Sequence, residues 1–352
     1  LVDPPAMSDD RDHATARALE RTTLWPSWAG IAVVATAFSL GVTLPDRLRY
    51  LPLLASVAFI GLPHGAVDHL AVPRARDKSP TRRWFARVGL LYLLVGGAYA
   101  GLWFLAPGLS VLLFIAMTWA HWGQGDLWPL LEVVGVDHLR SRVHRFGALL
   151  VRGGLPMLVP LWFFPDHYRA VVDAIVGRFA AAGSLDPLFD PAVRAGVVGG
   201  LAVLSGLVIL LGVARADDRE AWAIDAGETA LLWWFFATVP PVFAIGVYFT
   251  VWHSLRHVGR LIATDPGGHA ALGTGQYIQA FSRFAREATP LTLLSLLGLG
   301  GLYAAVPNPP GDVVAFIGLY LVFIAVLTLP HVVVVSAMDA EQGVWSVESV
   351  KR

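Results

Sequence analysis

The amino-acid sequence predicts an all-α protein, a polytopic bundle of about eight to ten transmembrane helices. Three observations predict this class. The chain has 352 residues, of which 56% are hydrophobic and only 15% are charged, whereas soluble domains carry about 25% charged residues. The mean hydropathy is +0.61. The apolar residues are gathered in runs of about 20, the length that crosses a bilayer as a helix.

The ends of the chain are polar. Residues 1–24 precede the first apolar run and lack the apolar core of a cleavable signal peptide. Their first six residues, LVDPPA, stand before Met7 and are interpreted as a candidate cloning remnant outside the fold. We therefore expect a single transmembrane domain over residues 25–340, followed by a C-terminal tail over 341–352.

The apolar runs place the predicted spans along the chain. Eight runs are clear, at 25–44, 50–72, 86–106, 109–128, 146–164, 194–214, 288–306 and 312–337. A longer block, 221–262, contains the sequence ATVPPVF. Two adjacent prolines remove two backbone donors and fix two φ angles, which favours separate helices near 221–238 and 240–262 over one kinked helix. The polar connection 165–193 has room for a short amphipathic helix at 168–180.

Loop charges favour ten spans over nine. With ten spans and the N-terminus inside, most Lys and Arg of the connecting segments lie on the cytoplasmic side, where they are normally enriched. With nine spans they are divided almost evenly. The sequence thus predicts a multi-pass protein of the plasma membrane with both termini and the basic loop 73–87 in the cytoplasm.

Composition also excludes several function classes. The formal net charge is zero, so nothing indicates a nucleic-acid partner. The chain has no cysteine, which excludes disulfides, thiol catalysis and Cys-ligated zinc.

Histidines mark the candidate site. Of the 11 in the chain, six lie within or at the ends of apolar runs: His64, His69, His121, His253, His257 and His331. Ionisable residues in membrane spans are rare and usually functional. The plain alternative is that these histidines form a polar layer at the membrane interface and cap helix ends. This interpretation explains a single histidine better than it explains six on several helices.

The expected depth of these histidines supports a shared site. In the ten-span topology, His64, His121, His253 and His331 each lie near the C-terminal end of a span that runs from outside to inside. They should therefore lie at similar depth, in the cytoplasmic half. Nine spans would place His253 and His257 near the opposite face.

Spacing suggests how the histidines are used. His253 and His257 are four residues apart, on one helical face, as two ligands of one metal can be. Asp68 follows His64 by four residues and is predicted to orient its imidazole. Asp126 is predicted to orient the imidazole of His121 in the same way. The alternative is that Asp126 ends the helix at the membrane interface. Imidazoles without a thiolate suit Fe, Cu, Zn or Ni.

These segments resemble the Brp/Blh family of membrane β-carotene 15,15′-dioxygenases. The matching motifs are PHGAVDH (63–69), HWGQGD (121–126), WHSLRH (252–257) and LPHVVVV (329–335), within a resemblance over roughly 50–340. The resemblance implies a helical membrane enzyme, with 25–340 as its catalytic domain. It implies a non-haem Fe(II) site that uses O2 to cleave β-carotene into two all-trans-retinal molecules. Both substrate and product would be held in the membrane lipid, and the resemblance implies that retinal is delivered to a microbial rhodopsin. The implied iron ligands are His64, His121, His253 and His257, with His69 and His331 as outer or alternative ligands.

A long polyene needs an apolar tunnel. The aromatic residues nearest the motifs are the predicted lining: Trp119, Trp122, Tyr248, Phe249 and Trp252, with Trp233, Trp234, Phe235 and Phe236 behind them. Tyr248 and Trp252 are favoured because they lie within two turns of His253. The alternative for each is an interfacial belt or helix packing.

Other functions fit parts of this pattern. Paired histidines can be the axial ligands of a haem in a membrane cytochrome, and a histidine network can relay protons in a transporter. A di-iron desaturase normally needs about eight histidines with adjacent pairs, and no HH occurs here. Arg152, inside an apolar run, either reaches the interface or binds a polar group in the core.

Overall fold

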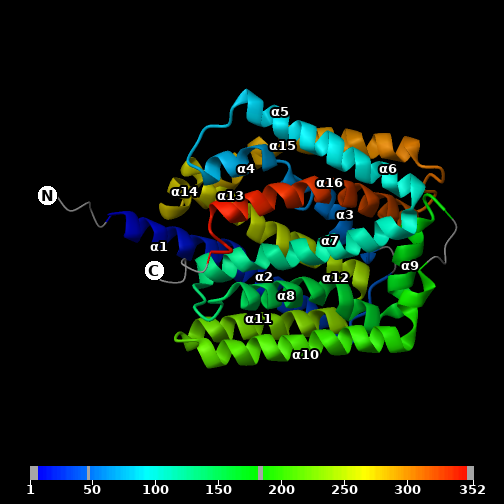
Figure 1. The fold of residues 1–352 in the computed structure, drawn as a ribbon, viewed down its shortest axis with the longest axis horizontal. Coiled ribbons are helices and arrows are strands. Elements are labelled where there is room, and N and C mark those ends of the chain that lie inside the picture. Colours follow the sequence, from blue (N-terminus) through cyan, green and yellow to red (C-terminus); the bar gives the residue numbers. More distant parts are fainter. Residues whose placement is uncertain (1–6, 46–47, 181–184, 347–352) are drawn as a thin grey trace.

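The structure is a computed structural model that describes residues 7–45, 48–180 and 185–346 (Figure 1). Within these ranges the regular structure is helical and contains no strand, which confirms the all-α class. Most helices lie lengthwise beside one another, and α9 stands across one end of the bundle (Figure 1).

The first half of the chain alternates regular helices with short irregular turns. Its helices are α1 (Met7–Leu19), α2 (Trp25–Ser39), α3 (Leu51–Ala58), α4 (Asp68–Ala75), α5 (Arg82–Leu91), α6 (Gly97–Leu105), α7 (Pro107–Trp128) and α8 (Arg142–Phe163). A 3₁₀ turn, Pro63–Gly65, stands between α3 and α4, and π-helical turns at Glu20–Leu24, Tyr92–Gly96 and Pro129–Val134 extend α1, α5 and α7.

The second half completes the bundle. Its helices are α9 (Pro165–Val176), α10 (Pro191–Arg215), α11 (Arg219–Thr238), α12 (Pro241–Val247), α13 (Leu255–Thr264), α14 (Pro266–Gly273), α15 (Tyr277–Ala305) and α16 (Val313–Glu341). A π-helical turn, Tyr248–Ser254, joins α12 to α13, and a 3₁₀ turn, Asp186–Phe189, precedes α10.

Among the residues that the structure describes, six segments are long and apolar enough to cross a membrane: Leu51–Ala75, Arg82–Leu105, Arg142–Phe163, Pro191–Arg215, Tyr277–Ala305 and Val313–Glu341. The remaining predicted spans also form helices, namely α2, α7, α11 and the α12–α13 segment. α7 and α11 carry several buried polar residues, which lowers their apolar content. A multi-pass membrane protein is compatible with these helices, and the number of eight to ten spans stays a prediction.

The predicted break at the two prolines is confirmed. α11 ends at Thr238 and α12 begins at Pro241, with Val239 and Pro240 in extended or other non-helical backbone. The amphipathic helix expected in the polar connection is also present, as α9, three residues earlier than predicted at its start.

Glycines bring α7 and α8 into direct backbone contact. A Cβ atom at Gly123 would lie 1.9 Å from the Leu149 carbonyl oxygen, and one at Gly153 would lie 1.8 Å from that of Trp119. No side chain fits at either position, so the two helices pack at the closest distance that backbones allow. This contact fixes the helix that carries His121.

Candidate metal centre

Five buried histidines converge in the interior of the bundle. They come from five separate segments: His64, His121, His253, His257 and His331. The ring centroids of His121 lie 4.8 Å from those of His253 and His331, and His64 lies 5.0 Å from His331. His64 also lies 5.4 Å from His253 and 5.6 Å from His257. We call these five residues the histidine cluster.

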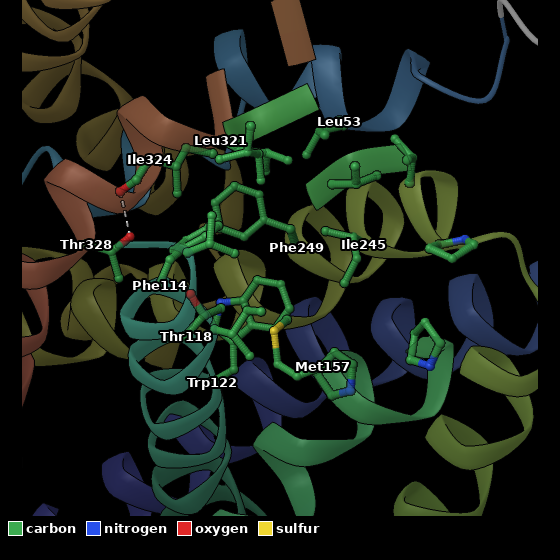
Figure 2. Close-up of a pocket in the computed structure, with 18 of the residues that line it drawn as sticks. Leu53, Phe114, Thr118, Trp122, Met157, Ile245, Phe249, Leu321, Ile324 and Thr328 are labelled. Carbon is green, nitrogen blue, oxygen red and sulfur yellow. Dashed lines mark hydrogen bonds between the residues drawn. The ribbon is translucent and has the colours of Figure 1, made fainter. Parts of the chain in front are cut away.

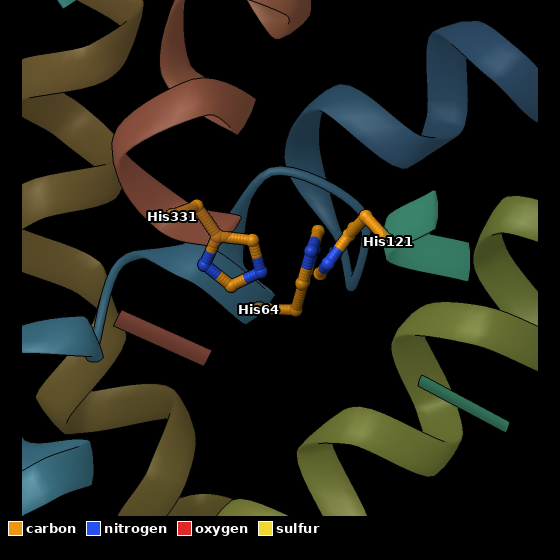
Figure 3. A group of neighbouring side chains, drawn as sticks. All are labelled: His64, His121 and His331. Carbon is orange, nitrogen blue, oxygen red and sulfur yellow. The ribbon is translucent and has the colours of Figure 1, made fainter. Parts of the chain in front are cut away.

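Ligand atoms of three members are close enough to share one metal ion. One ring nitrogen each of His64, His121 and His331 lies within 4.8 Å of the others (Figure 3). His253 and His257 stack in parallel with centroids 6.5 Å apart and an interplanar angle of 3°. Their placement on one helical face is therefore as predicted. His253 borders His64 and His121, and His257 borders His64 and His331.

Irregular backbone positions several members of the cluster. His64 lies in the 3₁₀ turn that interrupts α3 and α4, and His253 lies in the π-helical turn before α13. His331 follows Pro330, which removes one backbone hydrogen bond inside α16. Gly125 leaves room for the site, because a Cβ there would lie 3.1 Å from the His253 ring.

Asp68 hydrogen-bonds His331 and not His64, which corrects the predicted pairing. His331 Nδ1 lies 2.8 Å from Asp68 Oδ2 and 2.9 Å from Oδ1, and the Tyr92 hydroxyl donates to Oδ2 at 2.5 Å. The reason is local: the chain between His64 and Asp68 is not an α-helix, so four residues do not bring the two side chains onto one face. Asp68 holds the imidazole of His331 with Nε2 directed away from the carboxylate.

His64 is oriented by main chain. Its Nδ1 contacts the carbonyl oxygen of Gly61 and lies 3.3 Å from the Ser254 hydroxyl. Because the carbonyl can only accept, Nδ1 carries the proton and Nε2 has the free lone pair. Two members of the cluster thus have their tautomers fixed from outside.

The unpaired ring nitrogens fit a metal ion. Nε2 of His121, His253, His257 and His331 is buried and has no hydrogen-bond partner, and neither has Nδ1 of His121. Buried polar atoms are almost always paired, and neutral imidazole nitrogens are common ligands of iron, copper and zinc. The donor set of the histidine cluster therefore suits a histidine-ligated transition metal.

His69 lies outside the cluster. Its ring packs on Phe85 with centroids 5.2 Å apart, and its carbonyl oxygen accepts from the Trp84 indole. The expected role as an outer or alternative ligand is not supported by this placement, whereas His331 is a full member of the cluster. His69 follows Asp68 on α4, which turns its side chain away from the side that faces His331.

Asp126 accepts a hydrogen bond from Trp252 and not from His121. The Trp252 indole donates to Asp126 Oδ1 at 2.9 Å, and the Arg256 guanidinium lies 3.5 Å over the Trp252 ring centroid. Asp126 does not end a helix either, because α7 continues to Trp128. A spacing of five residues points Asp126 about 140° away from His121 around an α-helix, which explains why the two do not meet.

Asp126 belongs to a buried charge network behind the cluster. Arg152 pairs with Asp225 at 2.5 Å and Glu228 at 2.9 Å, and Arg256 pairs with Glu228 at 2.7 Å. Arg152 thus binds acidic groups in the core, one of the two roles the sequence left open. Buried charges persist only when paired in this way, and the network holds α7, α8, α11 and α13 together.

Two cavities meet at the cluster. The smaller, about 130 Å³, is lined by His64, His121 and His253 and by apolar residues such as Phe114, Met157 and Leu321 (Figure 2). The larger, about 640 Å³, is lined by His64, His331 and residues of α5, α15 and α16. His64, Phe249, Ile324 and Thr328 line both. The middle part of a long apolar molecule that fills both cavities would therefore lie beside the histidines.

Comparison with known proteins identifies the family. The family described as β-carotene 15,15′-dioxygenase matches residues 55–339. The chain belongs to this family.

Two relatives within the family match over most of the chain, and a third matches over a shorter part. A protein of Halobacterium salinarum strain NRC-1, named probable β-carotene 15,15′-dioxygenase Blh, is 49% identical over 93% of this chain and 95% of its own. The probable β-carotene 15,15′-dioxygenase Brp of strain R1 is 30% identical over 90% of both. The β-carotene 15,15′-dioxygenase of uncultured marine bacterium 66A03 is 39% identical over 30% of this chain and 44% of its own. No solved structure matches.

The aromatic residues predicted as tunnel lining divide into two groups. Trp122 and Phe249 line the smaller cavity, and Phe249 lines the larger as well. Trp119, Tyr248 and Trp252 line neither cavity, so the two cavities do not support the predicted role of Tyr248 and Trp252 as tunnel lining. Trp119 donates to the Leu150 carbonyl oxygen at 2.7 Å, and Trp252 is bound to Asp126. Trp233, Trp234, Phe235 and Phe236 also lie outside both linings.

Sequence reasoning missed Tyr92, Ser254 and Gly61, which contact the cluster or its carboxylate. Tyr92 lies in the apolar run 86–106, which has few polar side chains, and Ser254 lies inside the motif WHSLRH. These were the signals the sequence offered. Gly61 acts through its carbonyl, for which a sequence pattern gives no sign.

Proposed function

We propose that this protein cleaves β-carotene with O2 at the central 15,15′ double bond and forms two all-trans-retinal molecules. The site would be a non-haem Fe(II) ion held by the histidine cluster. The observation that carries the proposal is the meeting of two mainly apolar cavities at the histidine cluster, four of whose five members line them. A symmetric polyene whose halves occupy the two cavities has its centre at the histidines.

Four histidines are proposed as iron ligands from the motifs: His64, His121, His253 and His257. His331 joins them as a fifth candidate, because its Nε2 is unpaired and its ring borders three of the others. An iron(II) ion with an open position supplies the activation of O2. The protein's own groups do the remaining work.

The cluster's surroundings prepare the site for that chemistry. Asp68 and the Gly61 carbonyl bind Nδ1 of His331 and of His64, so that Nε2 of each ring is the nitrogen left for a metal. Phe249 and Trp122 pack on His253, with centroids 6.1 Å and 5.7 Å away, and help keep water from the cluster. The cavity walls bind the hydrocarbon halves by burial of apolar surface.

Substrate and product would both travel through lipid. β-Carotene partitions into the bilayer, and an intramembrane site avoids its transfer through water. Retinal is apolar apart from its aldehyde, and we propose that it passes to a microbial rhodopsin in the same membrane. The proposed setting is the plasma membrane.

Iron content and retinal formation test the proposal together. Purified protein should bind about one iron per chain and release retinal as the sole aldehyde from β-carotene, in lipid, only with Fe(II) and O2. His→Ala changes at positions 64, 121, 253 and 257 should each remove most of the iron, because affinity depends on the number of ligands. His69→Ala is the control for iron content, since His69 lies outside the cluster while its residue lines the larger cavity.

Several outcomes would contradict the proposal. Full iron and activity in a His→Ala variant would exclude that residue as a ligand. A strong Soret band would indicate a haem protein, and purified protein that binds no metal and forms no retinal would favour a transporter. A longer apocarotenal as the main product would place the iron away from the centre of the polyene.

A further inference from the structure

A buried threonine of the smaller cavity has a hydroxyl without a hydrogen-bond partner. Thr118 lies on α7, three residues before His121, and lines this cavity. The residue is 5% exposed, and its Oγ1 is buried and unpaired. Figure 2 shows Thr118 near Phe114 and Trp122. An unpaired buried hydroxyl destabilises a fold, so its position calls for an explanation.

Other helical threonines show the usual solution. Thr328, which lines the same cavity from α16, donates to the carbonyl oxygen of Ile324 at 2.8 Å, drawn as a dashed line in Figure 2. The same bond to the residue four earlier occurs at Thr22, Thr23, Thr36, Thr229, Thr238, Thr250, Thr264, Thr274, Thr289 and Thr292. Thr118 makes no such bond to Phe114. Its hydroxyl is free to donate to a molecule in the cavity.

The chemistry of the proposed function limits what that molecule can be. β-Carotene is a hydrocarbon and offers no acceptor. In the cleavage, the central C=C bond breaks and each of its carbons forms a double bond to one oxygen atom of O2, so polar atoms arise only at the histidine cluster. Thr118 and His121, three residues apart on one helix, share a face. The other lining hydroxyls are those of Thr328, already bonded, and Tyr168 on α9.

We propose that the Thr118 hydroxyl donates a hydrogen bond to the aldehyde oxygen of the retinal half formed in the smaller cavity. This inference rests on the proposed function. The bond is available only once oxygen has been inserted, so it stabilises the product-like state and not the bound hydrocarbon. Such an interaction raises kcat and leaves KM for β-carotene unchanged.

Binding of retinal to metal-free protein tests the bond without turnover. Isotope-edited infrared spectra of [15-¹³C]retinal in lipid nanodiscs report the frequency of its carbonyl stretch. Wild type, Thr118→Ser and Thr328→Val should share a frequency below that in Thr118→Val, and Thr118→Val should bind retinal about three- to tenfold more weakly. Thr328→Val is the matched control, because that hydroxyl is committed to Ile324. Thr118→Ala replaces Thr118→Val if the latter does not fold.

Turnover supplies an independent readout. In iron-loaded protein, Thr118→Val should lower kcat about three- to tenfold with KM unchanged, and Thr118→Ser should restore it. Equal carbonyl frequencies in Thr118→Val and wild type would overturn the inference, as would an equal loss of retinal affinity in Thr118→Val and Thr328→Val. A wild-type protein that forms no retinal would refute the proposed function alone, since the binding spectra decide on Thr118 without catalysis.

Discussion

Asp68 illustrates, at the scale of single residues, how a carboxylate outside the cluster sets the chemistry of a histidine inside it. It accepts from His331 Nδ1 at 2.8 Å and from the Tyr92 hydroxyl at 2.5 Å. The first bond fixes which nitrogen of His331 carries the proton. The second orients the carboxylate itself. Both bonds act on the cluster without adding a ligand.

Asp68→Asn should lower iron affinity about 10–100-fold, the usual loss when the hydrogen-bond partner of a ligating histidine is changed. The neutral amide keeps the shape of the carboxylate but loses its charge. Tyr92→Phe should produce a smaller loss, because it removes only the outer bond. Titration with Fe(II) or Co(II) measures both. Unchanged affinity in Asp68→Asn would show that His331 does not bind the metal.

At the scale of secondary structure, the π-helical turn Tyr248–Ser254 is the irregular element that positions two histidines of the cluster. It carries His253 and leads directly into α13, which carries His257. Trp252 on this turn is fixed from two sides, by its bond to Asp126 and by the Arg256 guanidinium over its ring. The buried charge network therefore positions the turn from which both histidines project.

Trp252→Phe should destabilise the protein by about 1–3 kcal/mol, because it leaves a buried carboxylate without one of its donors. Iron content should fall as well, since His253 follows Trp252 directly. Thermal unfolding and metal analysis measure the two effects. The matched control is Trp234→Phe, whose indole bonds Ser39 at an exposed site. Equal unfolding temperatures in the two variants would contradict the positioning role.

At the scale of the whole molecule, the histidine cluster lies between two apolar cavities. A bulky side chain that fills one of them should lower turnover without changing the iron content. Ile115→Phe, on the smaller cavity, should lower turnover several-fold while iron content stays near normal, because it shortens the space for one half of the polyene. Ala120→Phe is the control on the same helix, since Ala120 is exposed. Retinal formation and iron content in both variants provide the measurement. If both changes lowered turnover equally, the loss would come from a bulky residue anywhere on α7 and not from filling of the cavity.

The topology of the whole chain is predicted from loop charges. α1, the loop between α4 and α5, and the last described residues lie at the same end of the bundle (Figure 1). We predict that this end is cytoplasmic. A cysteine placed at the exposed Lys78 should react with an impermeant reagent only after cells are opened, and the natural chain has no cysteine to interfere. Labelling of intact cells would reverse the predicted orientation.

Much of the fold and the identity of the histidines could be predicted from sequence. Long apolar runs determine helices that a membrane can accept, because a buried backbone must satisfy its own hydrogen bonds. Pro240 and Pro241 end a helix by removing donors. The motifs of four histidines, 64, 121, 253 and 257, were sufficient to predict one shared site, and the structure brings those residues together.

Only the tertiary structure decided which partner each side chain meets. His331 enters the cluster and bonds Asp68 across 263 positions of sequence, whereas His69, adjacent to Asp68, turns away. Asp126 and Arg152 are paired through a network contributed by four helices. Helical spacing predicts contacts only while the helix is regular, and this site is built on a 3₁₀ turn and a π-helical turn. Its geometry therefore follows from how irregular segments pack against distant ones, which no local pattern in the sequence encodes.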